Sequence, residues 1–188
     1  MSSNLLIIIA VLIPIYCWYV TIISRRNKAL EALSGIDVAL KNRSDLIPNI
    51  LTIAKKFMEH EDKVFTEVTK LREQLSRDYD QKNPEDIKQH LALSEELSQQ
   101  MGALMLRVEN YPDLKSSQNM IQAQQTYNEM EAQISAARRF YNSAVASLRN
   151  SIQIFPGNIL AMMMRVKEMP LYEADEASKA PVDAGKFL

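Results

Sequence analysis

LLIIIAVLIPIYCWYVTII, the stretch at residues 5–23, decides where this chain is placed and how its fold begins. An α-helix of this length spans roughly 28 Å, close to the thickness of the hydrocarbon core of a membrane. Twelve of its residues are Leu, Ile or Val, and together they favour insertion into lipid by about 4–7 kcal/mol. Pro14 is compatible with insertion, because lipid offers the backbone no alternative to a helix. We therefore expect residues 1–24 to form a transmembrane anchor.

Positive charge follows the apolar stretch and does not precede it. Arg25, Arg26 and Lys28 lie on its C-terminal side, whereas residues 2–4 are uncharged. A cleaved signal peptide is the main alternative, but it begins with a positive region and ends at a small-residue cleavage site, and this sequence has neither. Since basic residues stay on the cytoplasmic side of a membrane, the sequence predicts a single-pass protein with its C-terminal domain in the cytoplasm.

The composition of the whole chain excludes several classes of protein. The 22 Lys and Arg residues are balanced by 23 Asp and Glu, so the basic excess expected of a nucleic-acid-binding protein is missing. Only four glycines are present, too few for an all-β chain or for Gly-rich phosphate-binding loops. The single cysteine, Cys17, has no partner within the chain for a disulfide.

Apolar side chains recur at steps of three and four residues in three stretches after the anchor, residues 29–75, 87–111 and 120–155. This spacing is typical of amphipathic helices, and short connections make neighbouring helices antiparallel. The predicted fold class is all-α: an N-terminal transmembrane helix followed by an antiparallel up-and-down bundle of long helices, over residues 25–169.

Prolines mark the expected breaks. Pro48 falls within the first stretch, which is either one helix kinked near Pro48 or two helices that meet at Ser44; we favour the kink. The polar residues 78–84 predict a turn, in which Asn83 caps the next helix. Breaks are also expected at residues 111–113 and, with Pro156 and Gly157, at the end of the third stretch.

The region after Gly157 predicts a shorter helix and a tail. Asn158 is placed to cap a helix from Ile159 to about Lys167, which contains Met162, Met163 and Met164. This methionine-rich helix either closes the open end of the bundle or contacts a partner or the membrane. Residues 170–188 are acidic and are expected to be a mobile tail.

The two histidines are the only residues that suggest metal chemistry. His60 lies in Glu-His-Glu-Asp, but the position four residues later is Val64, so a two-histidine zinc motif is missing. Neither His60 nor His90 has a Glu three residues before it, as a di-iron bundle requires. We predict no catalytic, cofactor-binding or metal-binding residue and no cofactor. A membrane-bound, metal-dependent enzyme that uses His60, His90 and nearby carboxylates is the alternative.

Five blocks of sequence, in order along the chain, resemble the bacterial LemA family. They are residues 34–49 (SGIDVALKNRSDLIPN), 109–115 (ENYPDLK), 137–142 (ARRFYN), 155–161 (FPGNILA) and 172–177 (YEADEA). The resemblance implies an N-terminal membrane helix, a helical bundle and a place in the bacterial plasma (inner) membrane. It carries over no enzymatic activity, cofactor or catalytic residue. The chain departs from the family at residues 162–165 (MMMR), where members often have aromatic residues and glycine.

One charged cluster in the first block has two open interpretations. Asp37, Lys41, Arg43 and Asp45 follow the membrane by a few helical turns, and they either stabilise the bundle or contact lipid headgroups or a neighbouring subunit. The leading hypothesis for the whole chain is a non-enzymatic, membrane-anchored scaffold or interaction protein. Its expected partners are the lipid bilayer, further copies of itself and an unidentified protein, with no nucleic acid. A membrane-shaping oligomer is a further alternative.

Overall fold

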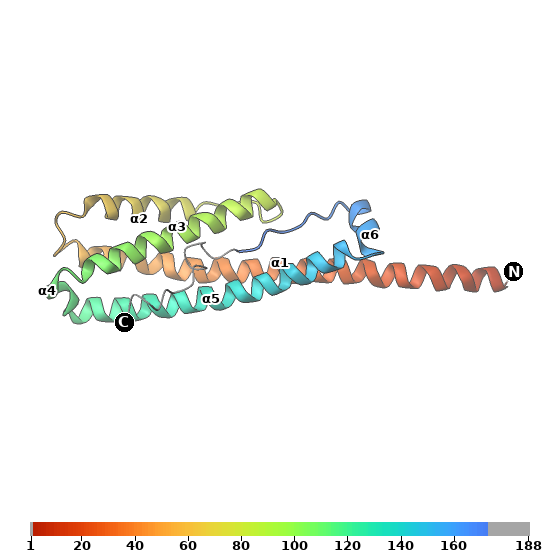
Figure 1. Cartoon of the computed structure of the whole chain (residues 1–188), viewed down its shortest axis with the longest axis horizontal. Helices are drawn as coiled ribbons and strands as arrows, with labels where there is room; N and C mark the ends of the chain where they lie inside the picture. Colours follow the sequence, from red (N-terminus) through yellow and green to blue (C-terminus); the bar gives the residue numbers. More distant parts are fainter. Residues whose placement is uncertain (1, 173–188) are drawn as a thin grey trace, which may run out of the picture.

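The computed structural model describes residues 2–172, and within them it contains α-helices and no strand (Figure 1). The helices are α1 (Ser2–Ala54), α2 (Asp62–Leu75), α3 (Pro84–Val108), α4 (Pro112–Lys115), α5 (Gln118–Gln153) and α6 (Gly157–Met163). The predicted all-α fold is confirmed.

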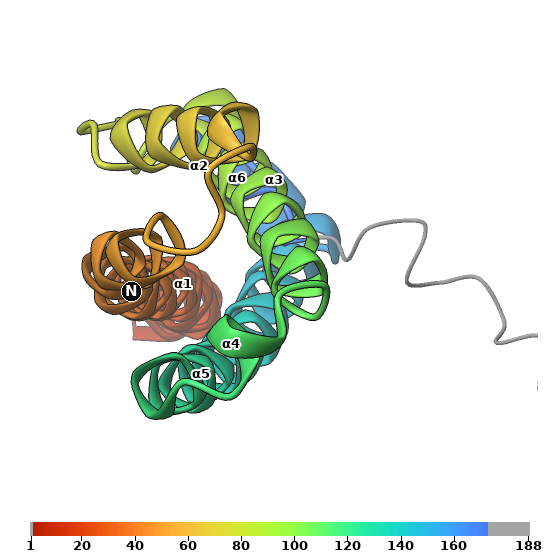
Figure 2. The ribbon, with the colours of Figure 1, turned by 90° about the vertical axis from the view of Figure 1, so that its left-hand side faces the viewer.

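Four long helices surround a common interior. The 53-residue helix α1 runs the whole length of the bundle, and α5 packs antiparallel along it (Figure 1). Helices α2 and α3 form an antiparallel hairpin beside this pair, and the end-on view shows the four helices around one centre (Figure 2). The N-terminal part of α1 projects beyond the bundle alone. This is the predicted up-and-down arrangement with an extended first helix.

Helix α1 continues through both Pro14 and Pro48 without a break. The alternative of two helices meeting at Ser44 is therefore wrong. The reversal comes later, at residues 55–61, which neither interpretation of the sequence placed as a break. The reason is that Met58, within this reversal, is buried in the core and keeps the apolar spacing unbroken across the turn.

The predicted helix caps have mixed outcomes. The cap at Asn83 is confirmed, because the side-chain oxygen of this residue accepts a hydrogen bond from the Glu85 N–H at 3.3 Å. Asn158 does not cap a helix that starts at Ile159; α6 begins two residues earlier, at Gly157, and ends at Met163. Position 157 requires glycine, because a Cβ there would collide with the Trp18 indole and the Ser151 carbonyl.

The core consists of two apolar clusters along the bundle axis. The first joins α1, α3 and α5 to α6 and the segment that follows it, from Ile22 to Tyr172. The second joins the end of α1 to α2, α3, α4 and the start of α5, from Ile47 to Tyr127. Arg43 lies on α1 between the residues of the two clusters, and it is 0% exposed.

Arg43 is held by a polar network inside the bundle. Its Nη1 donates to Glu131 Oε1 on α5 at 2.8 Å and to Ser98 Oγ on α3, and its Nη2 donates to the Ser94 carbonyl at 3.2 Å. Ser94 Oγ is 2.7 Å from the hydroxyl of Tyr172. The network thus connects α1, α3, α5 and the segment after α6.

Tyr172 is fixed by further contacts on α5. Its N–H donates to Asn142 Oδ1 at 2.8 Å, its carbonyl accepts from Asn142 Nδ2 at 2.9 Å, and the Arg138 guanidinium lies over its ring at 4.0 Å. The Tyr141 hydroxyl donates to the Pro170 carbonyl at 2.7 Å. The first three residues of the predicted tail are therefore packed on α5, and residues 173–188 lie outside the described residues.

We predict that the two partners of the buried ion pair respond unequally to substitution. Glu131→Ala leaves the Arg43 charge fully buried without a carboxylate and should lower the free energy of unfolding by roughly 3–5 kcal/mol. Arg43→Met should cost less, because Glu131 is partly exposed and can be hydrated. Denaturant unfolding of the full chain in mild detergent, followed by far-UV circular dichroism, measures both. Lys41→Met, at an exposed position of α1, is the matched control, and equal losses in all three variants would contradict the prediction.

Candidate functional site

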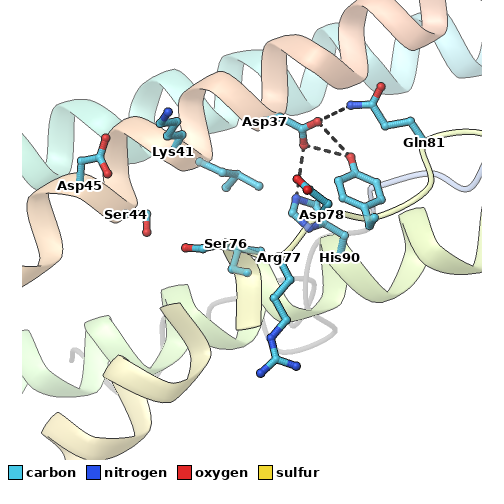
Figure 3. A pocket seen from close by; sticks show the side chains of 12 residues that line it. Asp37, Lys41, Ser44, Asp45, Ser76, Arg77, Asp78, Gln81 and His90 are labelled. Atoms are coloured by element: carbon cyan, nitrogen blue, oxygen red, sulfur yellow. Dashed lines mark hydrogen bonds and ion pairs between the residues drawn. The ribbon is translucent and has the colours of Figure 1, made fainter. Parts of the chain in front are cut away.

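A cleft of about 410 Å³ opens between α1 and the loop that joins α2 to α3 (Figure 3). Its walls come from one face of α1, from the end of α2 with the following loop, and from the start of α3. The lining residues are Asp37, Leu40, Lys41, Ser44, Asp45, Leu75, Ser76, Arg77, Asp78, Tyr79, Gln81 and His90.

Asp37 is the centre of the polar contacts in this cleft. Its carboxylate accepts hydrogen bonds from the Tyr79 hydroxyl, at 3.0 Å and 3.1 Å to its two oxygens, and from Gln81 Nε2 at 2.7 Å (Figure 3). Tyr79 and Gln81 belong to the loop that the sequence predicts as a turn. The carboxylate therefore fastens this loop to α1.

His90, on α3, lies beside Asp37 and Tyr79 in the cleft. Its Nε2 lies 3.3 Å from Asp37 Oδ1, but the atoms are not aligned for a hydrogen bond. Its ring stacks on Tyr79, with ring centroids 4.1 Å apart and an interplanar angle of 15°. Such a pair contributes about 0.5–1.5 kcal/mol beyond the area it buries. His90 is thus a packed residue with one ring nitrogen facing a carboxylate.

The structure does not bring the two histidines together. His60 is exposed in the reversal before α2, whereas His90 lies beside the loop after α2. A helix of 14 residues, roughly 21 Å long, intervenes. Among residues 2–172, no three His, Cys, Asp or Glu side chains gather as a metal site would require. The geometry therefore gives the metal-enzyme alternative no assembled centre.

The predicted charged cluster on α1 divides in two. Asp37, Lys41 and Asp45 line the cleft, whereas Arg43 points into the core and is fully buried. Contact between Arg43 and lipid headgroups, one of the two open interpretations, is therefore wrong, because no surface of this side chain is free. Lys41 and Asp45 are exposed at the mouth of the cleft.

The side chains that line the cleft can bind another molecule through charge and hydrogen bonds. Exposed charged side chains of both signs line it: Asp45 and Asp78 are acidic, and Lys41 and Arg77 are basic. Its two serines are already engaged or buried: Ser76 Oγ donates to the Arg72 carbonyl, and Ser44 is buried. Sequence reasoning missed Tyr79 and Gln81, whose role depends on where the loop returns to α1.

Comparison with known proteins identifies relatives over most of the chain. The model of the LemA family matches residues 32–184. A curated relative named Protein LemA, from Metamycoplasma hominis, is 26% identical over 163 residues, which cover 86% of this chain and 72% of the relative. The matched region begins within α1 and includes α2 to α6. The resemblance noted in the sequence is confirmed.

The environment of Tyr79 predicts how stability depends on pH. Burial and, secondly, the charge of Asp37 raise the pKa of Tyr79 well above its ordinary value, and the same two causes raise the pKa of Tyr141. Above pH 10 the unfolded chain releases these protons while the folded protein keeps them. Because the unfolded state then binds fewer protons, the free energy of unfolding should fall as the pH rises.

Asp37→Asn should let both tyrosines ionise at a lower pH in the folded protein, because it removes the second cause of their raised pKa and leaves the first, burial, in place. Thermal unfolding of the wild type and of Asp37→Asn, measured between about pH 9 and 11, tests the slope. Absorbance at 295 nm over the same range reports ionisation directly. Identical ionisation curves at 295 nm in the two folded proteins would show that Asp37 does not act on the tyrosines.

Proposed function

We propose that this chain, which belongs to the LemA family, is a membrane-anchored helical scaffold whose bundle lies on the cytoplasmic side and binds other proteins, including further copies of itself. The observation that carries the proposal is the continuity of α1, a single helix whose first part is an exposed apolar rod and whose later part packs along α5 in the bundle.

The first part of α1 has the surface of a lipid-facing helix. Eight large apolar side chains between residues 8 and 20 are 41–67% exposed, namely Ile8, Ile9, Leu12, Ile13, Ile15, Tyr16, Tyr19 and Val20. Among the described residues, α1 is the one helix long and apolar enough to cross a membrane. An apolar surface of this extent is unfavourable in water and favourable in lipid.

Basic residues at the base of the rod support the proposed orientation. Arg25, Arg26 and Lys28 follow the apolar stretch directly, and Arg25 Nη1 also donates to the Ser147 carbonyl of α5 at 3.0 Å. These charges therefore lie where the bundle begins. Positive residues favour the cytoplasmic side, which supports a cytoplasmic bundle.

Binding, and not catalysis, is what the bundle's surface favours. The central groups of the cleft are engaged with one another, and the Arg43 network is internal. Exposed apolar side chains on three helices, Val38, Leu106 and Phe140, offer contact points for another chain. A rigid bundle held at a membrane by its own longest helix suits the role of positioning partners.

We predict that charge introduced into the projecting part of α1 releases the protein from membranes. Ile9→Arg/Ile13→Arg places two cations in the apolar stretch, and each disfavours insertion by about 2.5–3.5 kcal/mol at the centre of a helix. The variant should move to the soluble fraction after alkaline extraction of membranes. Val38→Arg, at an exposed apolar position of the same helix, is the control and should stay in the membrane. Equal retention of the two variants would contradict the anchor.

A second prediction concerns self-association. The intact protein, solubilised in mild detergent and analysed by light scattering, should have a protein mass of at least twice the 21.5 kDa of one chain. In-cell cross-linking should capture a second copy or another protein. A strict monomer that also captures nothing would remove the basis for a scaffold and leave the anchor unaffected.

A further inference from the structure

We propose that the corner between α5 and α6, residues 154–163, is a second membrane contact that enters the lipid interface beside α1. This inference rests on the proposed anchoring by α1 and adds to it a fixed depth of the bundle in the bilayer. The occupant of this apolar surface is then lipid, and not another protein.

The corner is docked on the part of α1 that carries the predicted membrane span. Trp18 Nε1 donates to the Ser151 carbonyl at 3.2 Å, and Gly157 lies against both groups. Ala161 is buried in the same apolar cluster as Ile22. Figure 1 shows α6 where the projecting part of α1 leaves the bundle. Helix α6 is therefore fixed at the level of residues 18–22, within the apolar stretch.

The outward face of the corner is strongly apolar. Its five most prominent side chains are Met162, 81% exposed, Met163, Phe155, Ile154 and Ile159. They lie within ten consecutive residues, whereas the exposed apolar residues of the rest of the bundle are scattered. This surface continues the apolar surface of α1, because the corner is packed directly on that helix. Clustered apolar exposure of this kind marks a surface that water does not cover in the functional state.

The charges around the corner match a membrane interface. Residues 150–164 contain no charged side chain, and the nearest charges are Arg149 on one side and Arg165 and Lys167 on the other. Arg149 pairs with Glu168 at 3.4 Å, while Arg165 and Lys167 are exposed. Basic residues that flank an apolar segment favour the level of anionic lipid headgroups.

The length of α1 decides how deep the corner lies. The apolar stretch holds 13 residues before the docked Trp18, from 5 to 17, and 13 helical residues span roughly 20 Å. The hydrocarbon core is about 30 Å thick. The bilayer therefore extends past Trp18 towards Arg25, a further seven residues or about 10 Å. Because α6 is packed at this level, its outward face is in the interface.

Depth-dependent quenching in vesicles tests the proposal. Cysteines are introduced one at a time into the full chain with Cys17→Ala: Met162→Cys on the corner, Leu12→Cys on the anchor and Leu106→Cys, also exposed, on α3 of the bundle. Each is labelled with the fluorophore NBD, and the protein is reconstituted into phosphatidylcholine vesicles with phosphatidylglycerol. A spin label placed near the headgroup end of the lipid chain should reduce emission about twofold at position 162, and a spin label deeper in the chain should do so at position 12, while both leave position 106 unchanged.

The pattern of quenching separates this inference from the anchor itself. Quenching at position 12 without quenching at position 162 overturns the inference and leaves the anchor intact. Failure at both positions removes the anchor, and the inference with it. Emission at 162 that is shifted to the blue, yet is quenched by neither lipid nor aqueous iodide, places Met162 in a protein interface and also overturns the proposal. Met163→Cys, at a second exposed position, repeats the measurement independently.

Discussion

The guanidinium of Arg43 needs hydrogen-bond acceptors in the middle of the bundle, because a fully buried charge is strongly unfavourable unless it is paired. Its Nη atoms reach Glu131 on α5, Ser98 and the Ser94 carbonyl on α3, while its Nε has no partner among the described residues. A slide of α3 or α5 along α1 by one helical turn would break these bonds. Apolar clusters alone tolerate such slides better, because contacts between aliphatic side chains are not directional. The polar network therefore sets the register in which α1, α3 and α5 pack.

This register also fixes the bundle relative to the projecting part of α1. The same helix carries Arg43 in the core and Trp18 at the level of α6. About 25 residues separate the two positions, or roughly 38 Å of continuous helix. Two directional contacts on one rod, from α5 to Trp18 and from α5 to Arg43, leave α5 no freedom to move along it. The proposed depth of α6 is thus a consequence of packing inside the bundle and does not require lipid to set it.

The sequence predicted the fold well because its apolar periodicity is long and regular, and it predicted the interior less well because polar residues occupy positions of that periodicity. Arg43 lies three residues after Leu40 and four before Ile47, both buried, so it stands on the core face of α1. Ser94 stands likewise on the core face of α3. Each of these polar residues interrupts an apolar helix face, and this can be seen in the sequence. A single sequence does not show which of the interrupting residues contact one another in the folded bundle. The contacts between Asp37 and the loop are harder still to predict from the sequence, since they depend on where residues 76–83 return to α1.

The segment after α6, up to Tyr172, is also held in place by hydrogen bonds to the bundle. After leaving the corner at residues 154–163 it runs back along α5, where Tyr141 and Asn142 bind its backbone and Arg138 covers the Tyr172 ring. The Tyr172 hydroxyl then joins the Arg43 network through Ser94. One continuous stretch of chain therefore connects the proposed lipid contact with the buried charge at mid-bundle. A displacement of α6 would pull on the hydrogen bonds that set the helix register, so the position of α6 and the packing of the bundle are mechanically coupled.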